Sequence, residues 1–186
     1  MVGDLARPGR TIYQLDVLHH RLTPQDFGRV MQHLLACVFE AAGFHVVENA
    51  VGVPDFSAVP PIIARDCPTI AVEVKTTDKA VIFLTQRDLD GVSAPEQLGV
   101  VAVLMFPARN PGWLLIPAAS LCAGSWKVRH LMRKPRVEVG FSVDEMFRQL
   151  VGELETDAVT GGPGLEGWVK SQRHAFLANH LRLSTQ

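Results

Sequence analysis

The segment Ile70-Ala71-Val72-Glu73-Val74-Lys75 decides the fold, because it is an apolar run that carries two charges. Its length and apolar content predict a buried strand that begins at Thr69. Side chains alternate along a strand, so Glu73 and Lys75 point to one face while Val74 points to the other. Charges beside a core cost free energy unless they are paired or bound to a metal. The strand therefore predicts a functional site on one of its faces.

The turn Val53-Pro54-Asp55-Phe56 supplies a second carboxylate and leads into another short strand. Asp55 and Glu73 offer the oxygen ligands that Mg²⁺ and Mn²⁺ prefer, and the backbone carbonyl of Val74 can add a further one. Lys75 can position an attacking water and stabilise negative charge on a phosphate. The alternative is a salt bridge on a half-exposed strand, because Glu-x-Lys by itself is common. The Pro-Asp turn before the strand favours the metal site.

The flanking sequence predicts further helices and strands. Thr23 can cap a helix that begins at Pro24, and Gly43 is a natural stop after residue 42. Thr85 can cap a second helix that extends to about residue 98. We expect strands at 44–47, 56–59, 69–75, 81–84, 99–106 and 113–116, helices at 24–42, 86–98, 143–154 and 169–183, and loops at 60–68 and 156–167.

Residues 26–117 resemble the PD-(D/E)XK restriction-endonuclease-like nuclease superfamily, and most closely the archaeal-type Holliday junction resolvases and Mrr-like nucleases. The resemblance is carried by the helix exit, the aspartate turn, the charged strand, the next helix start and the closing strands, at 41–47, 53–56, 71–77, 83–88, 100–106 and 112–117. It implies an α/β fold, a mixed sheet flanked by helices in a restriction-endonuclease-like core, with a C-terminal helical extension. It also implies Mg²⁺- or Mn²⁺-dependent DNA cleavage by a homodimer, without a small-molecule cofactor.

One position departs from the family pattern. The family often carries a glutamate in the first helix, and this chain has Gln32 there. A glutamine can orient a water or bind a metal through its carbonyl oxygen, but it brings no charge. We include Gln32 among the catalytic residues, although it can equally mark a weakened or specialised site. Glu40 is expected at the surface, and His19, His20 and His33 are expected to be structural because their spacing does not suggest zinc.

Several polar and basic residues are candidates for DNA contact. Thr76 extends the charged strand, while Gln86 and Arg87 begin a helix whose N-terminal end favours phosphate. The densest basic run contributes Lys127, Arg129, Arg133 and Lys134. Near an active cleft such a run follows the phosphate backbone. The alternative for each residue is a solvated surface position, and Trp126 beside the run is expected to be a buried anchor.

The composition predicts a globular protein of the cytoplasm. The chain has 186 residues, of which 47% are hydrophobic and 20% charged, and its net charge of -1 means that any nucleic-acid site must be a local patch. Three widely spaced cysteines (Cys37, Cys67 and Cys122) fit a reducing compartment. No apolar run is long enough to span a membrane.

We divide the chain into an N-terminal segment (1–22), a nuclease core (23–120) and a basic, helical C-terminal extension (121–186) that can pack on the core. Within the irregular first segment, residues 12–18 fit either a short strand or a helical turn. The expected function is a metal-dependent endodeoxyribonuclease, either of restriction type or specific for Holliday junctions and branches. The alternative is a catalytically silent DNA-binding or assembly subunit that kept the nuclease fold.

Overall fold

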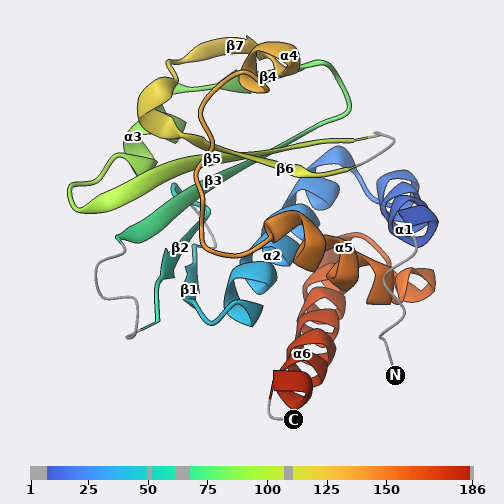
Figure 1. Ribbon diagram of the computed structural model, residues 1–186. Coiled ribbons are helices and arrows are strands. Elements are labelled where there is room, and N and C mark those ends of the chain that lie inside the picture. Colours follow the sequence, from blue (N-terminus) through green and yellow to red (C-terminus); the bar gives the residue numbers. More distant parts are fainter. Residues whose placement is uncertain (1–7, 50–51, 62–67, 107–110, 185–186) are drawn as a thin grey trace.

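The computed structural model describes residues 8–49, 52–61, 68–106 and 111–184, which form a mixed sheet flanked by helices (Figure 1). The sheet has five strands in the order β1-β2-β3-β5-β6. These strands are β1 His45–Glu48, β2 Phe56–Val59, β3 Thr69–Thr77, β5 Gln97–Met105 and β6 Trp113–Pro117. β3 runs parallel to β5, and the other neighbouring pairs are antiparallel. The expected α/β class is confirmed, and β6 is an edge strand of the sheet.

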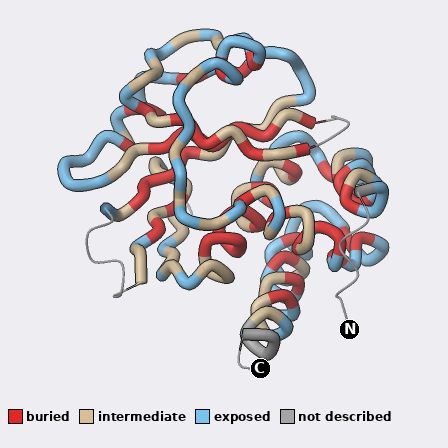
Figure 2. Tube along the Cα trace, viewed as in Figure 1, coloured by how far each residue is buried: buried red, intermediate tan, exposed pale blue. Residues whose placement is uncertain are grey.

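The middle of the sheet is buried on both faces, which explains the continuous apolar sequence of β3 and β5. Ile70 and Val72 belong to the hydrophobic cluster under one face, whereas Ala71 belongs to the cluster on the opposite face. Figure 2 shows this buried centre as a red band through the large sheet. By alternation, Glu73 and Lys75 share the face of Ala71.

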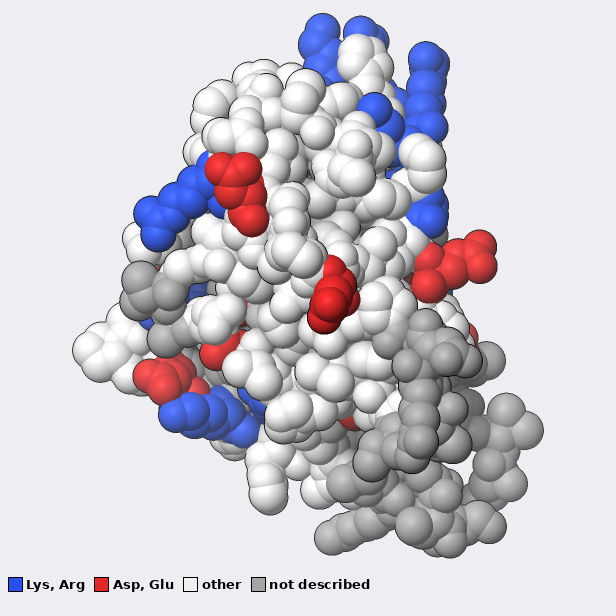
Figure 3. All heavy atoms as spheres, turned by 90° about the vertical axis from the view of Figure 1, so that its left-hand side faces the viewer, with Lys and Arg blue, Asp and Glu red and all other residues white. Residues whose placement is uncertain are grey.

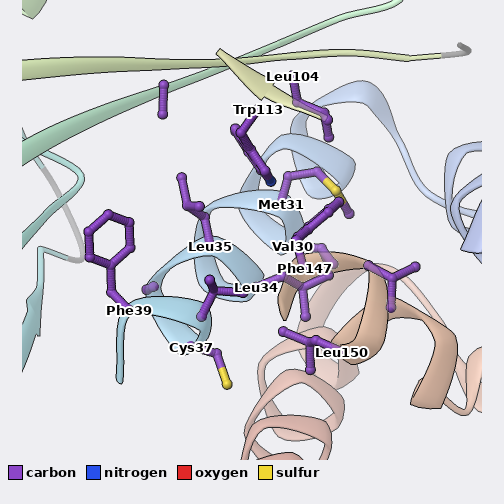
Figure 4. Packing of buried hydrophobic residues seen from close by; sticks show 14 of the residues in the cluster. Val30, Met31, Leu34, Leu35, Cys37, Phe39, Leu104, Trp113, Phe147 and Leu150 are labelled. Carbon is purple, nitrogen blue, oxygen red and sulfur yellow. The ribbon is translucent and has the colours of Figure 1, made fainter. Parts of the chain in front are cut away.

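Helix α2 (Pro24–Ala41) covers the first face of the sheet. It begins where Thr23 accepts a hydrogen bond from the backbone N–H of Asp26 at 3.1 Å, and Pro24 suits the first helical position. Gly43 follows the helix with a φ of 90°, which glycine adopts without steric cost. The expected helix is confirmed to within one residue. Figure 4 shows three buried side chains of α2, Met31, Leu34 and Leu35. They pack in one cluster with Leu104 and Trp113 of the sheet and with Phe147 and Leu150 of α5 (Val143–Glu153).

Helix α1 (Pro8–Arg21) occupies most of the segment expected to be irregular. Leu15 and Leu18 are completely buried, and Gln14 Nε2 donates to the Leu154 carbonyl at 3.0 Å. These partners belong to parts of the core that lie far away in the sequence. The helical turn allowed at 12–18 lies within α1, but the expectation of an otherwise irregular segment was wrong for residues 8–21. Most helical stability in proteins comes from tertiary packing, which local sequence does not reveal.

A two-stranded sheet lies over the second face, at the top of Figure 1. β4 (Val81–Leu84) pairs with β7 (Gly124–Lys127) in antiparallel register, and the short helix α4 (Val128–Leu131) follows β7. β4 forms where expected. β7 was not predicted, because the four residues Gly-Ser-Trp-Lys carry no strand pattern of their own and pair only when β4 is beside them.

Helix α3 (Gln86–Val92) packs on the same second face and is shorter than expected. The residue before Pro95 is disfavoured in the helical conformation, and Glu96 adopts a φ of 66°. These two residues turn the chain into β5, so positions 97 and 98 are strand rather than helix.

Helices α5 (Val143–Glu153) and α6 (Leu165–Ser184) pack against α2. Phe147 and Phe176 belong to the same hydrophobic cluster as the α2 residues. The ranges 1–22, 23–120 and 121–186 thus all contribute side chains to one core. None of the described helices is both long and apolar enough to cross a membrane.

The glycine-rich stretch at 156–167 is more ordered than the expected loop. It contains two 3₁₀ turns, Thr156–Ala158 and Gly162–Gly164, and α6 begins before the expected residue 169. Leu165 is 2% exposed, so burial of this side chain in the core accounts for the earlier helix start. Most of the other expected loop, at 60–68, lies outside the described residues.

Candidate metal and nucleic-acid site

Asp55 lies in the turn before β2 and reaches across to β3. Its Oδ2 accepts a hydrogen bond from the backbone N–H of Val74 at 2.7 Å. The turn is held by Asn49, whose backbone N–H donates to the Asp55 carbonyl at 2.9 Å and whose side chain donates to the Pro54 carbonyl at 2.7 Å. Asp55 is therefore fixed beside the charged strand.

Glu73 and Lys75 lie on the face of β3 that α3 covers. Lys75 Nζ is 2.6 Å from Glu73 Oε1 and 3.1 Å from Asp88 Oδ2. Glu73 is only 5% exposed, because Val101 of the parallel strand β5 lies beside it in register. The lysine ammonium is thus held between two carboxylates that come from different elements.

Asp88 is a site residue that sequence reasoning missed. It sits in the first turn of α3, where a capping box fixes it: Thr85 Oγ1 accepts from the Asp88 N–H, and Asp88 Oδ2 accepts from the Thr85 N–H at 2.8 Å. The pattern Thr-x-x-Asp after a strand signals the capping box. The contact with Lys75 depends on how α3 docks on the sheet, and no local signal gives it.

Burial dominates the electrostatics of the site. It raises the pKa of Glu73 to about 7, since the hydrogen bond from Lys75 offsets only part of the effect and the charge of Asp55 adds to it. Burial likewise raises the pKa of Asp55, against the opposing hydrogen bond from Val74. Burial alone would lower the pKa of Lys75, but its bonds to Glu73 and Asp88 outweigh burial and raise it. The group formed by Asp55, Glu73, Lys75 and Asp88 thus contains three carboxyl groups and one ammonium group.

The oxygen atoms of this group fit a hard divalent cation. Glu73 Oε2 is buried and has no hydrogen-bond partner among the described residues, which is a costly state for an acceptor. A cation held by Asp55 and Glu73 would satisfy this oxygen and offset the excess negative charge. No three His, Cys, Asp or Glu side chains gather as a metal site within the described ranges, so the two carboxylates need a backbone or water oxygen in addition.

Gln32 and Thr76 lie beside this group without joining it. Gln32 Nε2 donates to the backbone carbonyl of Asp55 at 3.3 Å, so the amide supports the turn rather than the carboxylate. Thr76 points to the α2 side, where a Cβ added to Gly28 would lie 3.5 Å from its Oγ1. The structure therefore places Thr76 on the opposite face from Lys75.

The basic run lies on β7, on α4 and in the segment that follows them. Figure 3 shows Lys and Arg side chains gathered at the upper end of the molecule, the level of β4, β7 and α4 in Figure 1. Lys127, Arg129 and Arg133 are exposed and form no ion pair with any described residue. Lys134 is engaged within the protein, because its Nζ donates to the Ser120 carbonyl at 2.8 Å and lies 4.8 Å from the Trp126 ring centroid.

Two of the remaining polar side chains near this surface already form hydrogen bonds within the protein. Gln86 Nε2 donates to Asp90 Oδ1 at 2.7 Å on the exposed side of α3, while the neighbouring Arg87 is exposed. Trp126 is half-buried rather than fully buried, and its indole N–H donates to the Cys122 carbonyl at 2.8 Å. The outward-facing groups at the start of α3 are therefore those of Arg87 and the engaged Gln86.

A second polar cluster joins α2, β1 and α6. Arg173 of α6 binds Glu40 through two nitrogens and also bonds Glu48, which in turn pairs with His33. These four side chains are between 16% and 26% exposed, so solvent screens them only in part. Glu40 is thus a half-buried ion-pair residue rather than the expected surface residue, and His33 takes part in this interhelical network.

His19 and the described cysteines lie outside both polar clusters. The ring of His19 packs edge-on against Phe27 with centroids 5.3 Å apart. Cys37 is buried, and burial raises the pKa of its thiol to about 12. Cys122 is an exposed free thiol, and Cys67 lies outside the described residues.

Among the comparisons with known proteins, only the search of solved structures gives matches. No protein-family model matches the chain, and no curated protein does. The solved structure of Hjc, a Holliday junction resolvase from the archaeal hyperthermophile Archaeoglobus fulgidus, matches 59% of this chain and 89% of its own with a TM-score of 0.44 and 18% sequence identity. A likeness this distant establishes neither a family nor an activity for this chain.

Proposed function

We propose that the protein is a divalent-metal-dependent endodeoxyribonuclease. The observation that carries the proposal is the buried carboxylate of Glu73, which has one oxygen unpaired and the other held by Lys75. Asp55 is fixed beside it by the bond to Val74. An unpaired buried acceptor of this kind is rare in a stable fold and is best explained by a ligand.

Asp55 and Glu73 would hold Mg²⁺ or Mn²⁺, with the backbone carbonyl of Val74 as a further oxygen ligand. When bound, the metal supplies positive charge to the phosphate and acidifies water in its coordination shell. The distribution of carboxylates supports this assignment, because Asp88 already pairs with Lys75 while Glu73 keeps a free oxygen.

Lys75 would act on the phosphate itself. Its raised pKa keeps the ammonium charged, and Glu73 and Asp88 hold it in one orientation. A fixed ammonium stabilises the negative charge that develops on a phosphate oxygen and orients the attacking water by hydrogen bonding. Gln32 would contribute by supporting the turn at Asp55, because its side-chain amide donates to the Asp55 backbone carbonyl.

The exposed lysines and arginines of β7 and α4 favour DNA as the substrate, because they are free to contact phosphates. Restriction-type cleavage and cleavage of Holliday junctions or branches are both compatible with this site.

We also propose that the protein acts as a homodimer in the cytoplasm. Sedimentation velocity tests the oligomeric state.

A cleavage assay tests the proposal directly. Supercoiled plasmid and a synthetic four-way junction are incubated with Mg²⁺, Mn²⁺ or EDTA, using wild type and Lys75→Met. We expect cleavage of at least one substrate with metal, none in EDTA, and a loss of at least about 100-fold in rate for Lys75→Met. Lys170→Met is the matched control, because Lys170 is 74% exposed and its ion pair is with Glu166, one turn away on α6.

The second candidate function is a catalytically silent DNA-binding or assembly subunit. Gln32 favours it, because a neutral amide stands where the resembling family often has a glutamate. Metal-independent DNA binding without cleavage of any substrate, in wild type and Lys75→Met alike, would establish this alternative and refute the nuclease.

A further inference from the structure

The outer face of the β4–β7 sheet exposes apolar side chains in a row. Along β4, Ile82 and Leu84 are buried while Val81 and Phe83 are 41% and 63% exposed. Phe83 is the most exposed large hydrophobic side chain in the described part of the chain. Because the inward residues already join the core on this side of the large sheet, Phe83 is not needed to hold the sheet in place.

The strand register places a cation beside these apolar side chains. Val81 lies opposite Lys127, and Phe83 lies opposite Ser125. Side chains of directly opposed residues share one face of an antiparallel pair. The outer face therefore combines an aromatic ring, a small apolar side chain, a hydroxyl and an ammonium group.

The surroundings of this face are strongly basic. The segments 78–84 and 124–136 together carry six lysines and arginines but one acidic residue, Asp78. Lys127, Arg129 and Arg133 are exposed and form no ion pair with the residues that the structure describes. Figure 3 shows basic side chains at this end of the molecule. An excess of unpaired positive charge around an exposed ring fits a polyanion that also offers apolar surface.

Nucleic acid with unstacked bases has this chemistry. Phosphates neutralise the lysines and arginines, and the exposed face of an unpaired base stacks on an aromatic ring. A second copy of this chain fits less well, because a symmetric contact would place Lys127 and its basic neighbours against the same residues of the partner. A fully paired duplex offers phosphates to this face but no free base surface.

The face is physically continuous with the candidate active site. β4 follows β3 through a short turn that Thr77 closes, with its Oγ1 3.0 Å from both the Val81 carbonyl and the Lys79 N–H. β4 then leads through Thr85 into the capping box that fixes Asp88, and Asp88 holds Lys75. A DNA strand bound on the β4–β7 sheet would therefore contact the same chain segment that positions Lys75.

We propose that the outer face of the β4–β7 sheet binds DNA with unpaired bases, and that Phe83 stacks on one of them. This inference rests on the proposed nuclease function, since it names the form of DNA that the same site receives. It makes Phe83 a specificity-determining residue that recognises bulged, branched or single-stranded DNA in preference to perfect duplex.

Fluorescence anisotropy in EDTA tests this binding without any cleavage. The probes are a fully paired duplex, the same duplex with an unpaired bulge, and a single strand. The variants are Phe83→Ala, which removes the ring, and Phe83→Trp, which keeps an aromatic surface. Tyr13→Ala is the matched control, because Tyr13 is also an exposed aromatic (60%) but belongs to α1. Thermal melting verifies that each variant is folded.

We expect Phe83→Ala to weaken binding of the bulged duplex and the single strand by about 5- to 100-fold, with about a twofold effect or less on the paired duplex. Phe83→Trp should bind like wild type. Equal weakening on all three probes, or no weakening on any, overturns the inference while leaving the nuclease proposal intact. Conversion of a dimer to a monomer by Phe83→Ala also overturns it, in favour of a second copy as the occupant. Absence of wild-type binding to every probe at low salt refutes the nuclease proposal as well.

Discussion

The substitution Glu73→Gln should stabilise the metal-free protein at neutral and alkaline pH. Glu73 is 5% exposed, and burial raises its pKa from 4.5 to about 7 in the folded protein. The folded state therefore binds a proton on this carboxyl more tightly than the unfolded state does. The contribution of Glu73 to stability is therefore highest below pH 4.5, where this carboxyl is protonated in both states, and falls as the pH rises toward about 7. Glutamine has a similar shape and no charge, so it avoids this loss.

The magnitude follows from the two pKa values. The interval between 4.5 and about 7, at about 1.4 kcal/mol for each pH unit, corresponds to about 3 kcal/mol at pH 8. Lys75 loses a charged partner in the variant but keeps Asp88, which reduces the gain. We therefore expect Glu73→Gln to be about 1–3 kcal/mol more stable than wild type at pH 8, and about equal to it at pH 4.

Glu48 offers a matched control with the opposite sign. Burial acts to raise the pKa of Glu48, but the hydrogen bond from His33 and the charges of His33 and Arg173 outweigh burial and lower it. A carboxyl group whose pKa is lowered by folding stabilises the folded state at pH values above its unfolded pKa of 4.5. This contribution disappears as the pH falls through the lower pKa of the folded state. Glu48→Gln should therefore destabilise the protein at pH 8, and the difference should shrink in acid.

Urea unfolding followed by tryptophan fluorescence measures these differences between pH 4 and pH 8.5, in EDTA. The chain carries three tryptophans, so the signal needs no label. If Glu73→Gln is no more stable than wild type at pH 8, burial of the charged carboxylate does not cost what the structure implies. If both glutamine variants change stability in the same direction, the distinction between the two glutamates is refuted.

Two further predictions concern packing and ion pairs. Arg173→Met should destabilise the protein by about 2–4 kcal/mol in urea unfolding, because Glu40 and Glu48 are left half-buried without this cation. A shift of the urea midpoint equivalent to less than about 0.5 kcal/mol would contradict this. Gly99→Ala should cost about 1–3 kcal/mol by thermal melting, because its Cβ would lie 2.3 Å from the Val92 backbone oxygen. Gly167→Ala is the control, because it lies in α6 with open space around it and should gain about 0.5–1 kcal/mol.

The arrangement of charges suggests how the C-terminal region serves the site. Arg173 ties α6 to Glu40 of α2 and to Glu48 at the end of β1. Asn49 follows Glu48 directly and holds the turn that presents Asp55. The ion pairs of α6 thus brace the segment that leads to one of the two candidate metal ligands.

Much of the core could be predicted from the sequence because its signals are local. The capped helix α2, the apolar strands β3 and β5 and the Pro-Asp turn each depend on residues within one short segment. The alternation along β3 also places Glu73 and Lys75 on one face, whatever the rest of the chain does. The face itself, and what covers it, do not follow from alternation.

Only the tertiary structure decided which distant residues meet at that face. Asp88 reaches Lys75 because α3 docks on β3, α2 covers the face to which alternation turns Thr76, and β7 exists because β4 offers it a partner. None of these contacts leaves a pattern within one segment, since each depends on free energy gained when two separate segments are brought together. The charged strand Glu73-x-Lys75 was therefore evident from the sequence, whereas the third carboxylate beside it and the exposed ring of Phe83 became evident only in the fold.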